Sequence, residues 1–164
     1  MFNHESPVRG ETFVTRKITI ATINIVLGLQ IKLLLGNLSA VRDWGHARDY
    51  VEAMWKILQH NKADDFVIAT GTVTSVRAFV EMSFNEIGIK LKFTGKGLDE
   101  VGSIKKIDYF KLKSLLKIEP DHLYVGKKII YVNEDFFRPT EVDFLKGDSS
   151  KARKVLNCWK KNKF

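Results

Sequence analysis

The longest apolar stretch, residues 18–35, sets the first limit on the fold. It is interrupted by Asn24, Gly28, Gln30 and Lys32. It therefore falls short of the roughly 18 uninterrupted apolar residues that a membrane-spanning helix needs. Its apolar side chains alternate with period two over residues 23–35, and its many β-branched residues lower helix propensity. Local rules predict a strand through much of this stretch, with Leu33–Leu35 as a short strand before the Gly36-Asn37 turn.

Two later segments have the apolar spacing of amphipathic helices. Asp49 is the predicted N-cap of the first, whose apolar positions are Val51, Met54, Trp55 and Leu58. The second follows Thr74-Ser75, runs from Val76 to Ile87, and has Gly88 in the C-terminal cap position. Aromatic stripes at helical spacing usually face a core, so we interpret Trp44, Met54 and Trp55 as packing residues.

Short strands are predicted between these helices, at 66–70, 91–93 and 128–132. Loops are expected at Asn3–Gly10 and 138–143. Thr12 or Thr15 is the expected N-cap of a helix near the N-terminus. A last helix is expected at 151–156, with Ser149 or Ser150 as its N-cap. Strands that alternate with helices indicate an α/β chain. Its 164 residues, 45% hydrophobic and 28% charged, suit a single domain with one modest core.

Neither a phosphate-binding glycine loop nor a metal motif is present. The chain contains no Gly-x-Gly-x-x-Gly or Gly-x-x-x-x-Gly-Lys, and the acidic neighbours Asp99 and Glu100 of Gly95-Lys96-Gly97 would repel phosphate. Cys158 is the sole cysteine, and the four histidines are scattered, so no metal site is expected. A lone cysteine and an N-terminus without the pattern of a signal peptide predict a cytoplasmic location.

The net charge of +8 is concentrated in two regions, residues 90–117 with +5 and residues 146–164 with +6. Lysine-rich ends of this kind are usually solvated. The lysines interleaved with apolar residues at 105–113 are typical of a half-buried surface element. Neither nucleic acid nor a membrane is therefore the expected partner.

Three blocks are more particular than propensity explains: residues 3–10 with 13–18, residues 35–38 with 42–55, and residues 137–145. Together they resemble the C-terminal half of the GDP-mannose 4,6-dehydratases, a family of extended short-chain dehydrogenase/reductases. Residues 65–71 and 75–81 also match, while residues 103–126 match least. The fold class that the resemblance implies is α/β, the C-terminal substrate-binding part of such an enzyme, lacking most of the Rossmann sheet.

The resemblance implies a reaction that converts GDP-mannose to GDP-4-keto-6-deoxymannose, the precursor of GDP-fucose. Tightly held NADP takes a hydride from C4, water leaves across C5 and C6, and the hydride returns at C6. The family places NADP and a catalytic Thr, Glu and Tyr-x-x-x-Lys in its N-terminal half, so residues 1–164 are expected to be a substrate-binding portion without catalytic residues, inactive alone. Tyr124 and Lys128 have the required spacing but lie outside the matching blocks, so we interpret that spacing as coincidence.

The resemblance also implies site residues. His4 and Arg9 match positions that contact NADP, and Asn3 lies beside the sugar diphosphate. Val14 and Lys17 match the segment along the guanine and its linkage, and Gly36 and Asn37 match the turn that closes over the nucleoside. Arg42 and Arg138 are expected to hold the diphosphate with their guanidinium forks, and Glu141 to accept hydrogen bonds from the ribose.

A helix that packs on the missing sheet would leave an apolar face uncovered, and we expect this at Ile18–Leu29, which the family makes helical. At about 25 cal/mol per Å², several hundred Å² of exposed apolar area is worth several kcal/mol. This predicts marginal stability, aggregation, or docking onto a partner, either a complementing N-terminal half or a second copy. Two alternatives stay open: a non-catalytic GDP-sugar-binding module, and a basic nucleic-acid or assembly protein that uses residues 90–117 and 146–164.

Overall fold

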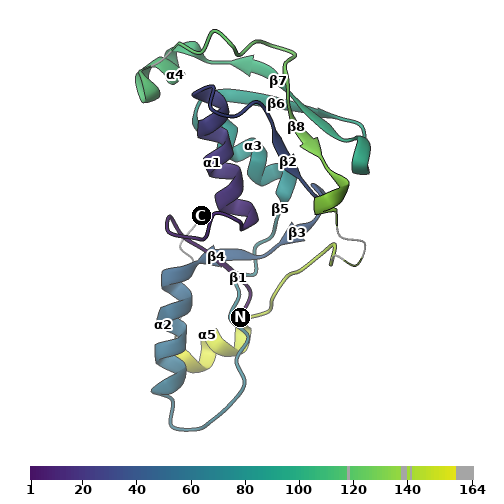
Figure 1. Cartoon of the computed structure of the whole chain (residues 1–164). Coiled ribbons are helices and arrows are strands. Elements are labelled where there is room, and N and C mark those ends of the chain that lie inside the picture. Colours follow the sequence, from purple (N-terminus) through teal and green to yellow (C-terminus); the bar gives the residue numbers. More distant parts are fainter. Residues whose placement is uncertain (118, 138–139, 141, 158–164) are drawn as a thin grey trace. The chain divides into compact units, whose positions relative to one another are not determined.

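The computed structural model describes residues 1–117, 119–137, 140 and 142–157 (Figure 1). The chain divides into two compact units. Unit 1 comprises Met1–Arg9, Ala40–Ser75 and Val142–Phe164, and unit 2 comprises Gly10–Ser39 and Val76–Glu141. Each unit is built from segments that are distant in sequence.

A mixed four-stranded sheet forms the frame of unit 2. Its strand order is β2 (Leu33–Leu35), β8 (Lys128–Val132), β7 (Val101–Ile107) and β6 (Ile89–Thr94). Strand β2 runs parallel to β8, and the other neighbours are antiparallel. The strands predicted at 33–35, 91–93 and 128–132 are confirmed.

Helices α1 (Val14–Val26) and α3 (Val76–Glu86) pack against each other in unit 2 (Figure 1). The strand predicted by local alternation is wrong, because burial follows helical spacing at Ile18, Ala21, Thr22 and Ile25. The buried Thr22 hydroxyl donates to the carbonyl of Ile18 at 2.8 Å, which satisfies it inside the helix. The N-cap of α1 is Phe13, without a side-chain cap, rather than Thr12 or Thr15.

The predicted uncovered face at Ile18–Leu29 is also wrong for most of its length. Ile18, Ala21, Ile25 and Val26 are buried within unit 2, and exposure begins only at Leu27. Helix α3 and strand β2 of the same unit contact α1 and cover most of its apolar face. The predicted end of α3 is confirmed, with Gly88 at φ +87°.

Three short elements complete unit 2: η1 (Gly97–Asp99), α4 (Tyr109–Leu116) and η2 (Glu134–Phe136). Asp108 caps α4 by accepting a hydrogen bond from the Lys111 amide at 2.9 Å. Within 105–113, Ile107 and Leu112 are buried while Lys105 and Lys106 are exposed. The half-buried surface element predicted there is confirmed.

Unit 1 contains two two-stranded sheets. In one, β1 (Asn3–Glu5) runs parallel to β4 (Trp44–His46), and in the other β3 (Val41–Arg42) runs antiparallel to β5 (Thr74–Ser75). The loop predicted at Asn3–Gly10 therefore begins with a strand. The strand predicted at 66–70 is absent, although Ile68 and Ala69 are buried as expected.

Helices α2 (Ala47–Leu58) and α5 (Ser150–Leu156) pack together in unit 1. Their shared core consists of Tyr50, Ala53, Ile68, Ala152 and Leu156. The N-cap of α2 is His46, whose Nδ1 accepts from the Arg48 amide at 3.2 Å, and not the predicted Asp49. Ser149 occupies the N-cap position of α5, but its hydroxyl donates to the carbonyl of Ala69 at 2.7 Å.

The outer face of α2 is exposed, contrary to the packing role predicted for it. Trp55 is 60% exposed and Leu58 81%, and Val51 and Met54 are also exposed. Of the three residues interpreted as packing, only Trp44 is buried. We refer to Val51, Met54, Trp55 and Leu58 as the α2 stripe. None of the helices in the described ranges is long and apolar enough to cross a bilayer.

Candidate functional site

The predicted site residues fall into two groups, one in each unit. Unit 1 contains Asn3, His4, Arg9 and Arg42, and unit 2 contains Val14, Lys17, Gly36 and Asn37. Arg138 and Glu141 lie outside the described residues, so their predicted roles remain predictions.

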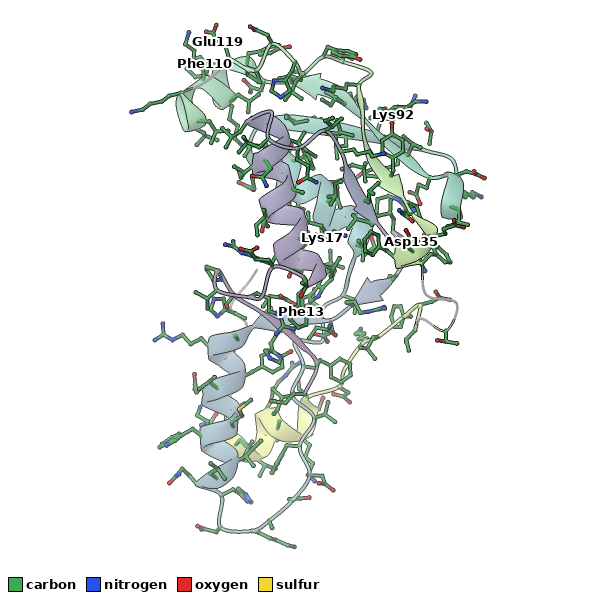
Figure 2. All side chains as sticks on the ribbon, in the orientation of Figure 1. Phe13, Lys17, Lys92, Phe110, Glu119 and Asp135 are labelled. Atoms are coloured by element: carbon green, nitrogen blue, oxygen red, sulfur yellow. The ribbon has the colours of Figure 1, made fainter. Side chains whose placement is uncertain are left out.

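Two of the predicted residues of unit 2, Lys17 and Gly36, lie against Phe136, the last residue of η2. The ammonium of Lys17 lies over the Phe136 ring, with Nζ 3.7 Å from the ring centroid. Figure 2 shows Lys17 on α1 and Asp135 on η2. Burial lowers the pKa of Lys17 below its usual value. Val14 precedes Lys17 by three residues and so lies on the same side of α1.

The turn after β2 contacts the same phenylalanine through its backbone. A Cβ atom on Gly36 would overlap the carbonyl oxygen of Phe136, so only glycine fits there. The position of η2 is fixed by the Asn133 amide, which donates to the carbonyl of Leu35 at 2.8 Å. Asn37 stabilises the turn by accepting a hydrogen bond at Oδ1 from the Ser39 amide at 2.9 Å. We call Lys17, Gly36, Asn37 and Phe136 the Phe136 cluster.

The side chains of the Phe136 cluster indicate what kind of ligand could bind there. A half-buried ammonium attracts an anion more strongly than a solvated one does, because less water screens the charge. Phe136 is 47% exposed, and an aromatic ring offers apolar area to a planar base. The cluster therefore suits a ligand that combines a planar ring with negative charge.

In unit 1 the two predicted residues of β1 lie beside Tyr50. The ring of His4 is 5.2 Å from the ring of Tyr50, centroid to centroid, and its Nδ1 is 3.2 Å from the carbonyl oxygen of Phe2. The Tyr50 hydroxyl donates to the carbonyl of Asn3 at 3.2 Å. Burial, with the negative charges of Asp43 and Asp49, raises the pKa of Tyr50 well above its usual value. Tyr50 therefore acts as a neutral hydrogen-bond donor that holds β1.

The two arginines predicted as site residues in unit 1 are held differently. Arg9 forms an ion pair with Glu5, with Nε 3.4 Å from Oε2. Arg42 donates from Nη1 to the carbonyl oxygens of Val41 at 3.0 Å and Val142 at 2.5 Å. These contacts place the Arg42 guanidinium against backbone, and its phosphate-binding role stays a prediction.

The sequence analysis missed Asp43, a fully buried carboxylate. It accepts hydrogen bonds from the Thr70 amide at 2.8 Å, the Thr70 hydroxyl at 2.5 Å, the Gly71 amide at 2.9 Å and the Gly147 amide at 3.2 Å. These bonds join three separate segments of unit 1 and stabilise a charge that would otherwise be costly to bury. The signal available in the sequence was an acidic residue within a matching block, directly before the apolar Trp44.

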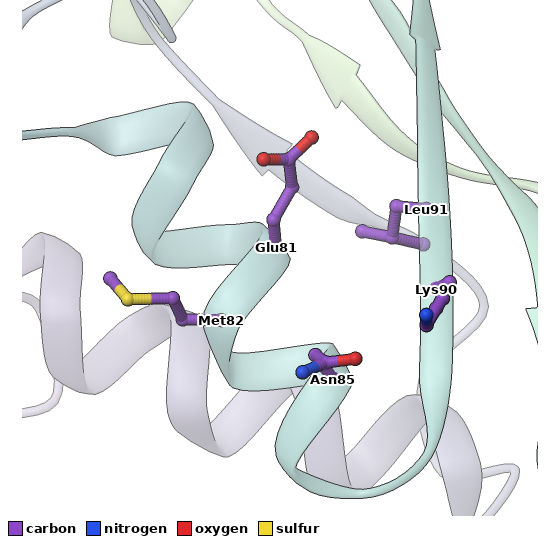
Figure 3. A pocket seen from close by; sticks show the side chains of 5 residues that line it. All are labelled: Glu81, Met82, Asn85, Lys90 and Leu91. Carbon is purple, nitrogen blue, oxygen red and sulfur yellow. The ribbon is translucent and has the colours of Figure 1, made fainter.

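A shallow hollow of about 260 Å³ lies between α3 and β6 in unit 2 (Figure 3). Glu81, Met82 and Asn85 line it from α3, and Lys90 and Leu91 from β6. It includes none of the predicted site residues, so it does not contribute to the candidate site.

Tyr124 and Lys128 do not lie on one helix, so their spacing of four residues does not place them on the same face. Tyr124 lies in the turn before β8, and Lys128 is the first residue of that strand. Within the part of the chain that the structure describes, no three His, Cys, Asp or Glu side chains gather as metal ligands do.

Comparison with solved structures defines the class of the fold. The structure of RMD from Pseudomonas aeruginosa complexed with NADPH superimposes with a TM-score of 0.61 at 16% identity, covering 95% of this chain and 40% of that one. The chain thus has the mixed α/β fold of part of an extended short-chain dehydrogenase/reductase.

Sequence comparison then gives the family. The family model for GDP-mannose 4,6 dehydratase matches residues 1–164. The GDP-mannose 4,6-dehydratase of Yersinia enterocolitica is 51% identical over 156 residues, which are 95% of this chain and 40% of that protein. The GDP-mannose 4,6 dehydratase of Dictyostelium discoideum is 49% identical over 164 residues, which are 100% of this chain and 41% of that protein. The chain belongs to the GDP-mannose 4,6-dehydratase family, and it spans about 40% of the length of these relatives.

Proposed function

We propose that this chain is the GDP-sugar-binding portion of a GDP-mannose 4,6-dehydratase and that it binds GDP-mannose. The observation that carries the proposal is the Phe136 cluster, in which the Lys17 ammonium lies over the Phe136 ring and the turn at Gly36 packs on the Phe136 backbone. The family match over the whole chain supports GDP as the nucleotide.

Each group of the cluster has a part in this proposal. Lys17 neutralises negative charge of the nucleotide, and ligand binding would raise its lowered pKa again. The Phe136 ring provides apolar area for the nucleoside, and the Gly36-Asn37 turn holds the Phe136 backbone in place. The roles of Arg42, Arg138 and Glu141 at the diphosphate and the ribose stay predictions from the resemblance.

The full reaction is proposed to need more than these residues. When NADP is bound, it supplies the hydride acceptor for dehydration of GDP-mannose. His4 and Arg9 of this chain are proposed to hold NADP. The half-buried His4 imidazole and the Arg9 guanidinium fit an anionic nucleotide, because both can donate hydrogen bonds. No described residue pair provides the tyrosine and lysine that the chemistry requires, so turnover is proposed only with a complementing half.

The α2 stripe is proposed as the place where that half, or a second copy, docks. It is a contiguous set of exposed apolar side chains on a helix whose other face is already buried in unit 1. Exposed patches of this kind usually mark protein contacts. We place the assembled protein in the cytoplasm, in keeping with its single cysteine.

Thermal unfolding of the purified chain with GDP-mannose and with NADP tests the proposal. A ligand that binds only the folded state raises its stability by about 2.7 kcal/mol at 100 times Kd, so GDP-mannose is expected to raise the Tm. Lys17→Gln is expected to reduce that rise, whereas Lys92→Gln, which removes an exposed lysine of unit 2 (Figure 2), leaves it unchanged. An unchanged Tm at millimolar GDP-mannose would reject the site. Salt-dependent binding of RNA or DNA instead would favour the basic-protein alternative.

A further inference from the structure

An ion pair in unit 2 joins α3 to the end of η1. Arg77 donates from Nε to Oε1 of Glu100 at 2.5 Å and from Nη2 to Oε2 at 2.9 Å. The Glu100 residue is 3% exposed. This fork-to-fork geometry fixes the guanidinium in one orientation, because both carboxylate oxygens are engaged. A buried carboxylate of this kind depends on its partner, since its charge would otherwise be desolvated without compensation.

The same arginine reaches the turn of the Phe136 cluster. Its Nη2 also donates to the hydroxyl oxygen of Ser39 at 3.2 Å, and its backbone amide donates to the carbonyl of Leu38 at 2.9 Å. The Ser39 amide in turn donates to Oδ1 of Asn37 at 2.9 Å. A continuous chain of hydrogen bonds therefore runs from Glu100 through Arg77 and Ser39 to Asn37.

The anchor of this chain is itself fixed in the sheet. The Glu100 amide donates to the carbonyl of Gly97 at 3.2 Å, and the Glu100 carbonyl accepts from the Val132 amide at 3.4 Å. Glu100 thus stands between η1 and β8, directly before β7 begins at Val101. The Arg77 guanidinium therefore links the turn at residues 36–39 to Glu100, which is bonded to strand β8 of the four-stranded sheet.

We propose that Arg77 is a positioning residue that holds the Gly36–Ser39 turn in the conformation that receives a nucleoside diphosphate, with Glu100 as its anchor. This inference rests on the proposed GDP-sugar site. If the turn is ordered before the ligand binds, binding carries no entropy cost for ordering the turn. The ion pair therefore raises affinity without contacting the ligand. The role needs arginine, because the single nitrogen of lysine cannot bond Glu100 and Ser39 in this planar arrangement.

Two substitutions separate positioning from stability. Arg77→Lys keeps the charge but loses the fork, and Ser39→Ala removes only the bond on the turn side while leaving the Arg77–Glu100 pair intact. Glu119→Gln is the matched control, because it breaks the exposed ion pair with Lys113 in the same unit. The readouts are urea unfolding, hydrogen exchange of the Leu38 and Ser39 amides without ligand, and the Kd of GDP-mannose.

Ser39→Ala is expected to speed exchange of the turn amides and to weaken GDP-mannose binding, each about tenfold, with an unchanged unfolding midpoint. Arg77→Lys is expected to speed amide exchange and weaken GDP-mannose binding more strongly than Ser39→Ala does. Glu119→Gln is expected to change neither the exchange nor the binding. Unchanged exchange in Ser39→Ala and Arg77→Lys would overturn the inference. So would a loss of affinity that follows only the unfolding midpoint. Because exchange is measured without ligand, a wild-type chain that fails to bind GDP-mannose would reject the proposed function while leaving the turn's dependence on Arg77 to be judged from exchange.

Discussion

The two units differ in the size of the sheets that support their cores. Unit 2 packs α1 and α3 together beside a four-stranded sheet, and the inner residues Ile18, Ile25, Val80 and Phe84 are almost completely buried. Among its described residues, unit 1 has two-stranded sheets and a small core around Tyr50, while the α2 stripe stays exposed. The frame that carries the Phe136 cluster is thus larger, whereas unit 1 depends more on individual polar contacts.

The physical reason lies in the sheets. Two-stranded sheets are marginal in water, and parallel strands such as β1 and β4 normally occur in larger sheets that are covered on both faces. Unit 1 compensates with the buried carboxylate of Asp43, which joins three segments that hydrophobic packing alone would hold weakly.

The largest expected effect follows from removing that carboxylate. Asp43→Ala leaves the partly buried amides of Thr70 and Gly71 and the buried amide of Gly147 without their acceptor, and we expect a loss of about 3 kcal/mol or more from the stability of unit 1. Hydrogen exchange should show loss of protection at Thr70 and Gly71 while the amides of β7 and β8 stay protected. Asp64→Ala, which breaks an exposed ion pair with Lys151 in the same unit, serves as the control. Equal loss of protection in both units would show that the two units unfold together as one.

The second effect is in unit 2 and tests the Phe136 cluster. Gly36→Ala forces a methyl group into the carbonyl of Phe136, so η2 must move, and we expect a destabilisation of about 2 kcal/mol. Binding of GDP-mannose should weaken with it. Gly10→Ala is the matched control, because its added methyl meets only the Phe13 side chain, which can shift. A Gly36→Ala protein with wild-type stability would contradict the close approach seen at this turn.

The third effect concerns association rather than folding. Trp55→Lys and Leu58→Lys alter exposed side chains, so the free energy of unfolding should change by about 0.5 kcal/mol or less. Sedimentation velocity should then show less self-association, and the variants should not combine with a complementing half. Phe110→Lys in unit 2, which replaces another exposed apolar residue, is the control. If Phe110→Lys reduces association equally, the α2 stripe has no special role.

The same contrast explains what the sequence could predict. In unit 2 the strands at 33–35 and 128–132 and the helix after Val76 follow their local patterns, because those patterns match the way the segments are buried. Helix α1 is the exception: its residues satisfy both a two-residue and a helical period, and packing against α3 decides between them. In unit 1 the apolar spacing of α2 correctly predicted a helix but not which face is buried, since that depends on what packs beside it.

The site was predictable only in part, for a similar reason. Lys17 came from the resemblance alone, whereas residue type marked Gly36 as part of a turn but not as a site residue. The contact of both with Phe136 joins segments about a hundred residues apart, which no local pattern reveals. The pairing of Arg77 with Glu100 is equally invisible before folding, because an arginine on a helix and a glutamate before a strand are ordinary surface residues until the fold brings them together.

The smallest expected effect is the pH dependence of Lys17. Burial lowers its pKa in the folded protein, so between that lowered value and the ordinary 10.5 the unfolded chain binds more protons than the folded one. Stability must therefore rise with pH across that window, relative to Lys17→Met, as the cost of burying the charge disappears. Affinity for GDP-mannose should fall over the same window, because the neutral amine no longer attracts phosphate. Urea unfolding and calorimetry at pH 7 to 10.5 measure both trends, with Lys92→Met as the control. If affinity does not change with pH while stability does, Lys17 is buried as described but does not face the ligand's charge.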